Sequence, residues 1–423
     1  MPFWPAPTDH VVDKARAAHH QRVGVEAAHV ASAPATWLLI GEHVDHYGGI
    51  VAAGLSDLRA AAAVSPREDS TITVTYRVDG PGEPQAREES TTLDTLSQLA
   101  AAQQPGVDEA GQPVPPPFPT GGLAERFGGV VSTMVSRQLL SRETTGVDIT
   151  VVTDIPTYSG LGGLAAADVA VALAMLGGNE DPHDAPLRAR LAEVCSQAVN
   201  SFAALPALRA RHTAALRGNG RQVSIIDYAD GSVTQAPHPL GDKVHAFVVA
   251  VPDSTPDPQI GVDLRIRQRF VDNACHAFGT ESLRLLPDAS SRVLDWLDAV
   301  HEVHPEQDHP EHADVASWLG FYAAETDRAL GTARSLRSRR GADLLPLLHQ
   351  SQSALGSIYH LPVAAEVAEL VTARGAVAAR AAAAGVANSV IAYVPAERAQ
   401  NFSQDLADDG LLVVPVNPGE PAA

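Results

Sequence analysis

A strand that leads into a glycine-rich turn and then into an apolar helix is the feature that most restricts how this chain can fold. The stretch VDITVVTDIP at 147–156 is typical of a strand, and the turn SGLGG follows at 159–163. The next residues, LAAADVAVALAML, form a helical pattern that is apolar on nearly every side. Such a helix is stable in water only when other elements cover it, so we expect it inside a packed domain.

The remaining signals alternate irregularly between strand and helix. Strands are predicted at 35–40, 71–78, 222–228, 244–251, 388–394 and 411–416. A helix is predicted at 123–141, a Pro/Gly/Gln-rich exposed loop at 103–122, and a mostly helical pattern up to about 388. Another helix begins at Asp184, because Pro186 follows it. Its apolar face comprises Leu187, Leu191, Val194, Ala198 and Phe202. This order of elements predicts an α+β protein.

Length and composition set further limits. A chain of 423 residues exceeds what one hydrophobic core usually serves, which predicts two domains, at 1–220 and 221–423. The formal net charge of −20 argues against nucleic acid and anionic membrane surfaces as partners. Two cysteines cannot make a disulfide framework, and the sequence lacks a secretory signal and a long apolar segment. We therefore expect a soluble cytoplasmic protein without a membrane partner, and a monomer rather than an oligomer.

The stretch IGEHVDHYGG carries four ionisable side chains within five positions: Glu42, His43, Asp45 and His46. The residues alone leave three alternatives open, namely a metal site, a solvated polar loop and a site for a hydroxylated ligand. Carboxylates accept hydrogen bonds from hydroxyls, and an imidazole can donate or accept them. A second His-rich stretch, HEVHPEQDHPEH at 301–312, reads better as a solvated loop than as a metal site.

Three stretches resemble motifs of the galactokinases, which belong to the GHMP kinase superfamily. APATWLLIGEHVDHYGG at 33–49 is similar to APGRVNLIGEHTDYNGG, and DIPTYSGLGGLAAADVA at 154–170 is similar to DIPLGAGLSSSAALEVA. AARAAAAGVANS at 378–389 is a weaker counterpart of GSRMTGGGFGGC, and the resemblance covers about 30–420. It implies the two-domain GHMP kinase fold, in which a cleft between α+β domains holds a sugar and a nucleotide. It also implies ATP and Mg²⁺ as cofactors.

The resemblance assigns roles to two groups of residues. It implies that sugar hydroxyls are bound by Glu42, His43 and Asp45. It implies that the nucleotide phosphates are cradled by Gly160, Leu161, Gly162 and Gly163. Backbone N–H groups at the start of a helix attract anions, which is consistent with the second group.

The side chains that the family uses for phosphoryl transfer are changed. The three family serines of the glycine-rich turn correspond to Gly162, Gly163 and Leu164, and Tyr158 replaces a family glycine. The family glutamate that binds the metal corresponds to Val199. The family's catalytic aspartate, the arginine that pairs with it and a sugar-facing tyrosine correspond to Arg211, Thr36 and Leu264. We therefore assign no catalytic residue and no metal ligand.

These observations favour a galactokinase-like protein that binds galactose or a related sugar and has lost or weakened ATP-dependent sugar 1-phosphorylation. The alternative is an active galactokinase with a rearranged site, in which Asp168 or His212 replaces a lost group. A third idea is an anionic ligand bound by Arg209 and Arg211, although both arginines could simply face solvent. A fourth is a metal hydrolase that uses His43, Asp45 and His46.

Overall fold

The computed structural model describes Trp4 and residues 10–80, 84–107, 113–179, 181–239, 243–305 and 309–423. The chain divides into two compact units, each described by itself here. The first comprises Met1–Trp37, Leu55–Gly220 and Val416–Ala423, and the second comprises Leu38–Gly54 and Arg221–Pro415. One boundary lies between Gly220 and Arg221, while 38–54 and 416–423 lie in the other unit from their sequence neighbours.

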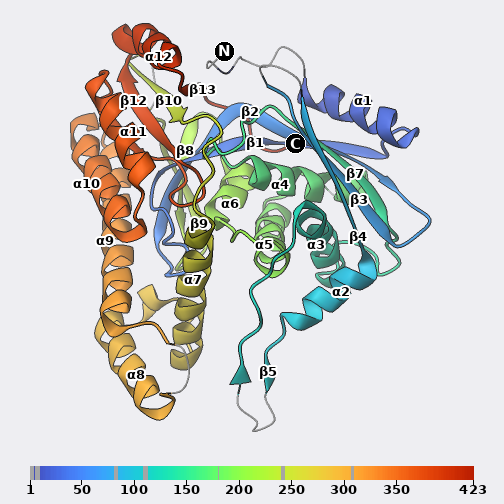
Figure 1. The fold of residues 1–423 in the computed structure, drawn as a ribbon, viewed down its shortest axis with the longest axis horizontal. Coiled ribbons are helices and arrows are strands. Elements are labelled where there is room, and N and C mark those ends of the chain that lie inside the picture. Colours follow the sequence, from blue (N-terminus) through green and yellow to red (C-terminus); the bar gives the residue numbers. More distant parts are fainter. Residues whose placement is uncertain are drawn as a thin grey trace. The chain divides into compact units, whose positions relative to one another are not determined.

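The first unit is a mixed sheet, with both antiparallel and parallel strand pairs, and helices pack on it (Figure 1). Its elements are α1 (Val11–Val23), β3 (Thr71–Val78), β4 (Gln85–Thr92), α2 (Leu93–Ala102), β5 (Gly106–Val107), β6 (Pro113–Val114), α3 (Leu123–Ser136), β7 (Val147–Thr153), α4 (Gly163–Leu176), the 3-10 turn Gly177–Asn179, α5 (Ala185–Phe202) and α6 (Arg209–Arg217). The strands β1 (His29–Ile40) and β2 (Ile50–Pro66) contribute residues to both units. The strand order in the first unit is β4-β3-β7-β2, with β3 and β7 parallel.

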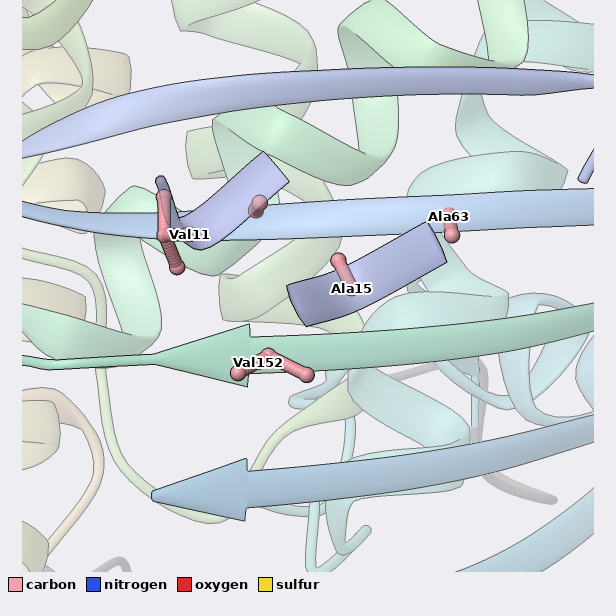
Figure 2. Packing of buried hydrophobic residues seen from close by; sticks show 5 residues of the cluster. Val11, Ala15, Ala63 and Val152 are labelled. Atoms are coloured by element: carbon pink, nitrogen blue, oxygen red, sulfur yellow. The ribbon is translucent and has the colours of Figure 1, made fainter. Parts of the chain in front are cut away.

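Both faces of this sheet are covered. In Figure 2, Val11 and Ala15 of α1 lie against Ala63 of β2 and Val152 of β7, in a cluster with Ala61, which pairs with Val152 in register. Side chains alternate along a strand, so the neighbouring residues of β7 point to the opposite face, where α4 packs. The apolar helix that the sequence predicts is α4, and all but a few of its residues are buried.

The second unit contains a four-stranded sheet in the order β11-β12-β10-β13 and a helical part in which α9 and α10 pack together (Figure 1). Its elements are β8 (Gln222–Asp227), β9 (Ser232–Pro237), β10 (Val244–Ala250), α7 (Pro258–Phe278), a 3-10 turn (Leu283–Leu285), α8 (Ala289–Val303), α9 (His312–Arg337), α10 (Gly341–Tyr359), α11 (Pro362–Ala373), β11 (Ala378–Ala381), β12 (Ser389–Pro395), a 3-10 turn (Ala396–Arg398), α12 (Ala399–Asp408) and β13 (Leu412–Val416). The start of β2 pairs with β8, which pairs with β9.

Most predicted elements agree with the structure, and the differences have local causes. Asp184 caps α5 by accepting a hydrogen bond from the Leu187 N–H, and the five residues of the predicted apolar face are buried. The helix predicted at 123–141 ends at Ser136, since Gln138 adopts a positive φ of 60°. The helical pattern to about 388 is wrong beyond Ala373, because Gly375 adopts a φ of 109° and β11 pairs with β12.

Two segments that the sequence suggested as loops contain short regular elements. The stretch 103–122 includes the β5–β6 pair, and its residues 108–112 lie outside the described ones. The His-rich stretch includes the end of α8 and the start of α9, and 306–308 lie outside the described residues. Within the described ranges, no helix is long and apolar enough to cross a membrane.

Candidate functional site

The acidic and histidine cluster forms a loop between β1 and β2 in the second unit. Backbone hydrogen bonds from the Gly48 N–H to the Asp45 carbonyl (3.1 Å) and from the Gly49 N–H to the Val44 carbonyl (2.8 Å) fix its turn. Gly41 adopts a φ of 90°, and a Cβ there would lie 2.2 Å from the Ile50 carbonyl oxygen. A side chain at this position would therefore push the loop away from β2. We call residues 41–49 the GEHVD loop.

Glu42 of the GEHVD loop is fully buried. Its Oε1 accepts a hydrogen bond from the Ala384 N–H at 2.8 Å, and its Oε2 lies 3.0 Å from Nη2 of Arg380. Arg380 is also fully buried and comes from β11, within the weakest of the three motif-like stretches. A buried carboxylate needs such partners, because moving it out of water without them would cost several kcal/mol.

His43 adopts a positive φ of 60°, which is uncommon for a residue with a side chain. Its Nε2 lies 2.7 Å from the Ala384 carbonyl oxygen, which can only accept, so Nε2 carries the proton. Burial lowers the pKa of His43, and the nearby Glu42 and Asp45 only partly oppose this, so the ring is neutral at pH 7. Nδ1 is then an acceptor, and it makes no hydrogen bond. An acceptor in this position suits a ligand hydroxyl.

Asp45 is buried in the same loop and interacts electrostatically with Tyr322 of α9. Burial raises the pKa of Tyr322 to about 12, with Asp45 adding to the rise and Arg267 opposing it. The ring of Tyr359 lies 4.9 Å from that of His43, centroid to centroid, and Cζ of Arg267 lies 4.6 Å above the Tyr359 ring. No local sequence pattern indicates Tyr322, Tyr359 or Arg267 as neighbours of the loop, since these residues are far from it along the chain.

The structure does not assemble the metal site that His43, Asp45 and His46 suggested. Nδ1 of His46 faces Asp272 at 3.5 Å, while Nε2 of His43 is held by a carbonyl group. Across the ranges that the structure describes, no group of three or more His, Cys, Asp or Glu residues has a metal-binding arrangement. In the His-rich stretch, the rings of His301 and His309 stack, with centroids 5.7 Å apart.

The glycine-rich loop connects β7 to α4 in the first unit. Gly160 and Gly162 adopt φ values of 76° and 69°, and α4 begins with the Ala166 N–H bonded to the Gly162 carbonyl. Ser159 closes the preceding turn by donating to the Pro156 carbonyl at 2.8 Å. Tyr158, which stands where the family has a glycine, is 40% exposed. The Leu161 carbonyl accepts from the Thr36 N–H, so β1 fixes the loop from one side.

The Arg211 side chain lies against this loop. A Cβ at Gly162 would meet Cδ of Arg211 at 2.8 Å and both Nη1 of Arg211 and Oγ1 of Thr36 at 3.0 Å. Nη1 of Arg211 donates to the Thr36 carbonyl, and Arg211 is only 3% exposed. The two residues that correspond to a family Asp–Arg pair therefore do meet, but here the cation comes from α6 and its partner in β1, Thr36, is neutral. Arg209, two residues earlier, pairs with Glu193 at 3.0 Å.

Asp168 and His212, the suggested replacements for lost catalytic groups, belong to a buried network beneath the glycine-rich loop. Asp168 receives two hydrogen bonds from Arg126, at 2.8 and 2.6 Å, and one from Nε2 of His212 at 2.9 Å. Burial alone would raise the pKa of Asp168, but Arg126 and His212 keep it below the usual value. Nδ1 of His212 lies 3.0 Å from Oγ of Ser196. All four side chains are buried, so the network braces α3, α4, α5 and α6.

Comparisons with known proteins agree with this picture. Residues 17–66 match the family model described as the galactokinase galactose-binding signature. The chain is 24% identical over 393 residues to a galactokinase of Chloroflexus aggregans. This match covers 91% of this chain and 89% of the relative. It is 25% identical to a galactokinase of Streptomyces coelicolor, over 88% of this chain and 86% of that one. The match to human galactokinase, at 26% identity, spans 64% of this chain and only 62% of the relative's length.

Solved structures with a similar fold also include a galactokinase. A crystal structure of Lactococcus lactis galactokinase complexed with galactose matches with a TM-score of 0.68 at 15% identity, covering 98% of this chain and 100% of that one. A mevalonate kinase of Methanococcus jannaschii matches with a TM-score of 0.54 at 11% identity, covering 92% and 98%. The mixed α+β architecture is therefore that of the GHMP kinases. Together with the signature and the relatives that match over most of the chain, it shows that the chain is similar to the galactokinases.

Proposed function

We propose that this protein binds galactose or a related sugar through the GEHVD loop and has lost, or greatly weakened, ATP-dependent sugar 1-phosphorylation. The sugar part is supported by the acceptors of the loop. Nδ1 of the neutral His43 is a buried acceptor without a partner, and the Asp45 carboxylate lies in the same turn. A site that pairs hydroxyls in this way discriminates strongly against analogues that lack them.

The loss of phosphoryl transfer is supported by one observation above all, the position of Arg211. Its guanidinium lies against Gly162 and bonds to Thr36, in the space beside the glycine-rich loop. A bound nucleotide needs a divalent cation held by protein oxygens, and a fixed arginine beside the loop cannot supply them. No Asp or Glu occurs from residue 194 to residue 226. The residues present therefore do not fit Mg²⁺–ATP, and we derive no catalytic step through it.

The rearranged-kinase alternative lacks a structural basis in the residues suggested for it. Asp168 has both oxygens engaged and no exposed surface, and His212 bonds on both ring nitrogens. A general base must reach the proton that it removes, and neither side chain has access to a ligand. A cytoplasmic location and a sugar as the main partner complete the proposal.

Three measurements test the two halves of the proposal separately. Calorimetric titration with galactose should give saturable binding that Asp45→Ala removes, whereas no binding to galactose or any related sugar refutes the sugar site. A coupled assay with ATP, Mg²⁺ and galactose should give no turnover above background. Nucleotide titration should show weak binding that tightens in Arg211→Ala and stays unchanged in the matched control Arg209→Ala. Tight Mg²⁺–ATP binding by the unmodified protein would contradict the second half of the proposal.

A further inference from the structure

We infer that the sugar bound by this protein carries a carboxylate, as a hexuronate does, and that Arg267 of α7 binds this carboxylate beside the GEHVD loop. The inference rests on the proposed sugar binding and narrows the class of ligand. It places the anion at a different residue from Arg209 and Arg211, which the sequence suggested for one. Arg267 is partly buried and belongs to the same unit as the loop.

The guanidinium of Arg267 has hydrogen-bond donors that no group of the protein uses. Nη2 donates to the Ile358 carbonyl, near the end of α10, at 3.0 Å. Nε and Nη1 are buried and make no hydrogen bond. Asp263, one turn earlier on α7, accepts from Gln259 at 2.9 Å, and no carboxylate among the described residues forms an ion pair with Arg267. A buried cation without a counter-ion is costly, which favours an anion as the group that completes this site.

The arrangement of the unused donors matches a carboxylate. A guanidinium holds its N–H groups in one plane, with a pair of parallel donors on the edge from Nε to Nη2 and another on the edge from Nη1 to Nη2. Nη2 has two hydrogens, one on each edge, and the Ile358 carbonyl takes one of them. Whichever it takes, the other hydrogen completes an edge with Nε or with Nη1. A carboxylate has two oxygens that fit such an edge, whereas a hydroxyl offers only one.

Two aromatic rings hold the guanidinium in place but do not neutralise it. Cζ of Arg267 lies 5.1 Å from the ring centre of Trp318 and 4.6 Å from that of Tyr359. Cation–π attraction restricts where the side chain can go and leaves its charge intact. Burial raises the pKa of Tyr359 well above its usual value, although Arg267 opposes the rise. The Tyr359 hydroxyl therefore stays protonated and supplies no negative charge to Arg267.

The same tyrosine links Arg267 to the GEHVD loop. The Tyr359 ring lies 4.9 Å from the His43 ring, centroid to centroid. Burial lowers the pKa of His43, and the charge of Arg267 adds to this lowering. Asp45 and Arg267 act on the pKa of Tyr322 in opposite directions, after the larger effect of its burial. A sugar whose hydroxyls bond to Nδ1 of His43 and to Asp45 would thus have a further substituent next to Arg267.

Calorimetric titration with four compounds tests the carboxylate site: galacturonate, its neutral amide, galactose and galactose 1-phosphate. Galacturonate should bind the unmodified protein roughly tenfold or more tightly than galactose or the amide, because hydrogen bonds between charged groups are the stronger ones. Arg267→Met should remove this preference and leave the galactose affinity nearly unchanged. Arg267→Lys keeps the charge but not the paired donors, so it should retain only part of the preference. The matched control Arg374→Met removes an exposed arginine of the same unit and should leave every affinity unchanged.

Thermal unfolding shows whether the variants are folded. Arg267→Met leaves no carboxylate without its partner, so its Tm should stay close to that of the unmodified protein. Galacturonate should raise the Tm of the unmodified protein more than that of Arg267→Met.

The possible failures of this inference and of the proposed function differ. Equal binding of galacturonate and its amide overturns the carboxylate site while sugar binding stands, as does an equal loss of galactose and galacturonate affinity in Arg267→Met. Tighter binding of galactose 1-phosphate than of galacturonate also overturns it, because the anion would then be a phosphate. If the unmodified protein binds none of the four compounds, the proposed function falls and this inference falls with it.

Discussion

Replacing Asp168 by asparagine should destabilise the first unit far more than any surface change. The substitution keeps the side-chain shape but removes the negative charge that faces Arg126 at 2.6 and 2.8 Å and His212 at 2.9 Å. Asp168 has no exposed surface, so the remaining cation cannot be solvated without local unfolding. Breaking a buried pair by removing one partner typically costs about 3–5 kcal/mol. In a unit of this size, that corresponds to a fall in Tm of roughly 6–20 °C.

The assay is urea and thermal unfolding followed by circular dichroism, with the unmodified protein as reference. The control is Glu193→Gln, which breaks the exposed pair with Arg209 and should change the free energy of unfolding by less than about 1 kcal/mol. Replacing Arg126 and Asp168 together by methionine should recover most of the loss, because no unpaired charge remains between them. If Asp168→Asn shifted Tm no more than Glu193→Gln did, the reasoning about the buried network would be refuted.

Three further predictions concern other positions. Burial raises the pKa of Asp154 to about 6, so the folded state holds its proton more tightly than the unfolded one, and stability should fall as the pH rises from about 4 to 6. Urea midpoints at pH 4.5 and 7 should show this fall, and Asp154→Asn should flatten it; an equal slope in both proteins contradicts the assignment. Gly162→Ala should lower the free energy of unfolding by about 1–2 kcal/mol, because its φ is positive and Arg211 lies in the way, whereas Gly178→Ala, with nothing near it, serves as control. Phe402→Ala should cost about 3–5 kcal/mol in denaturant unfolding, since the ring is buried against Phe247 at 5.7 Å, while the exposed Asn401→Ala should be nearly neutral.

Local pattern was sufficient for the elements whose side chains repeat with a clear period. The strand at 71–78, the start of α5 at Asp184 and the buried α4 follow from alternation, capping and uniform apolarity. The strand β11 could not be predicted in this way, because its AARA sequence favours a helix and only its pairing with β12 makes it a strand. The short elements around 103–122 have too little periodicity to be predicted from the sequence.

The candidate site could be predicted only in part from the sequence, for a similar reason. The GEHVD loop is continuous in sequence, so its residue types and the family resemblance identified Glu42, His43 and Asp45 together, and their roles stay predictions. The groups that decide what each side chain can do come from elsewhere: Ala384 and Arg380 lie more than three hundred residues away. Likewise, alignment with a motif marks Arg211 as a replaced residue, but only the structure brings its guanidinium against Gly162. Long-range contacts of this kind leave no trace in local periodicity.

The exchange of segments between the two units has a consequence for the order in which the chain can fold as it leaves the ribosome. Residues Leu38–Gly54 are made early but belong to a unit whose other residues, Arg221–Pro415, come much later. The first unit in turn contains Val416–Ala423, so its last piece is made after nearly everything else. Domains usually mature one after another during synthesis, but here neither unit has all of its residues until Pro415 has been made. Expressing 1–220 and 221–423 as separate fragments should therefore yield two incomplete products, each lacking a segment that the other carries.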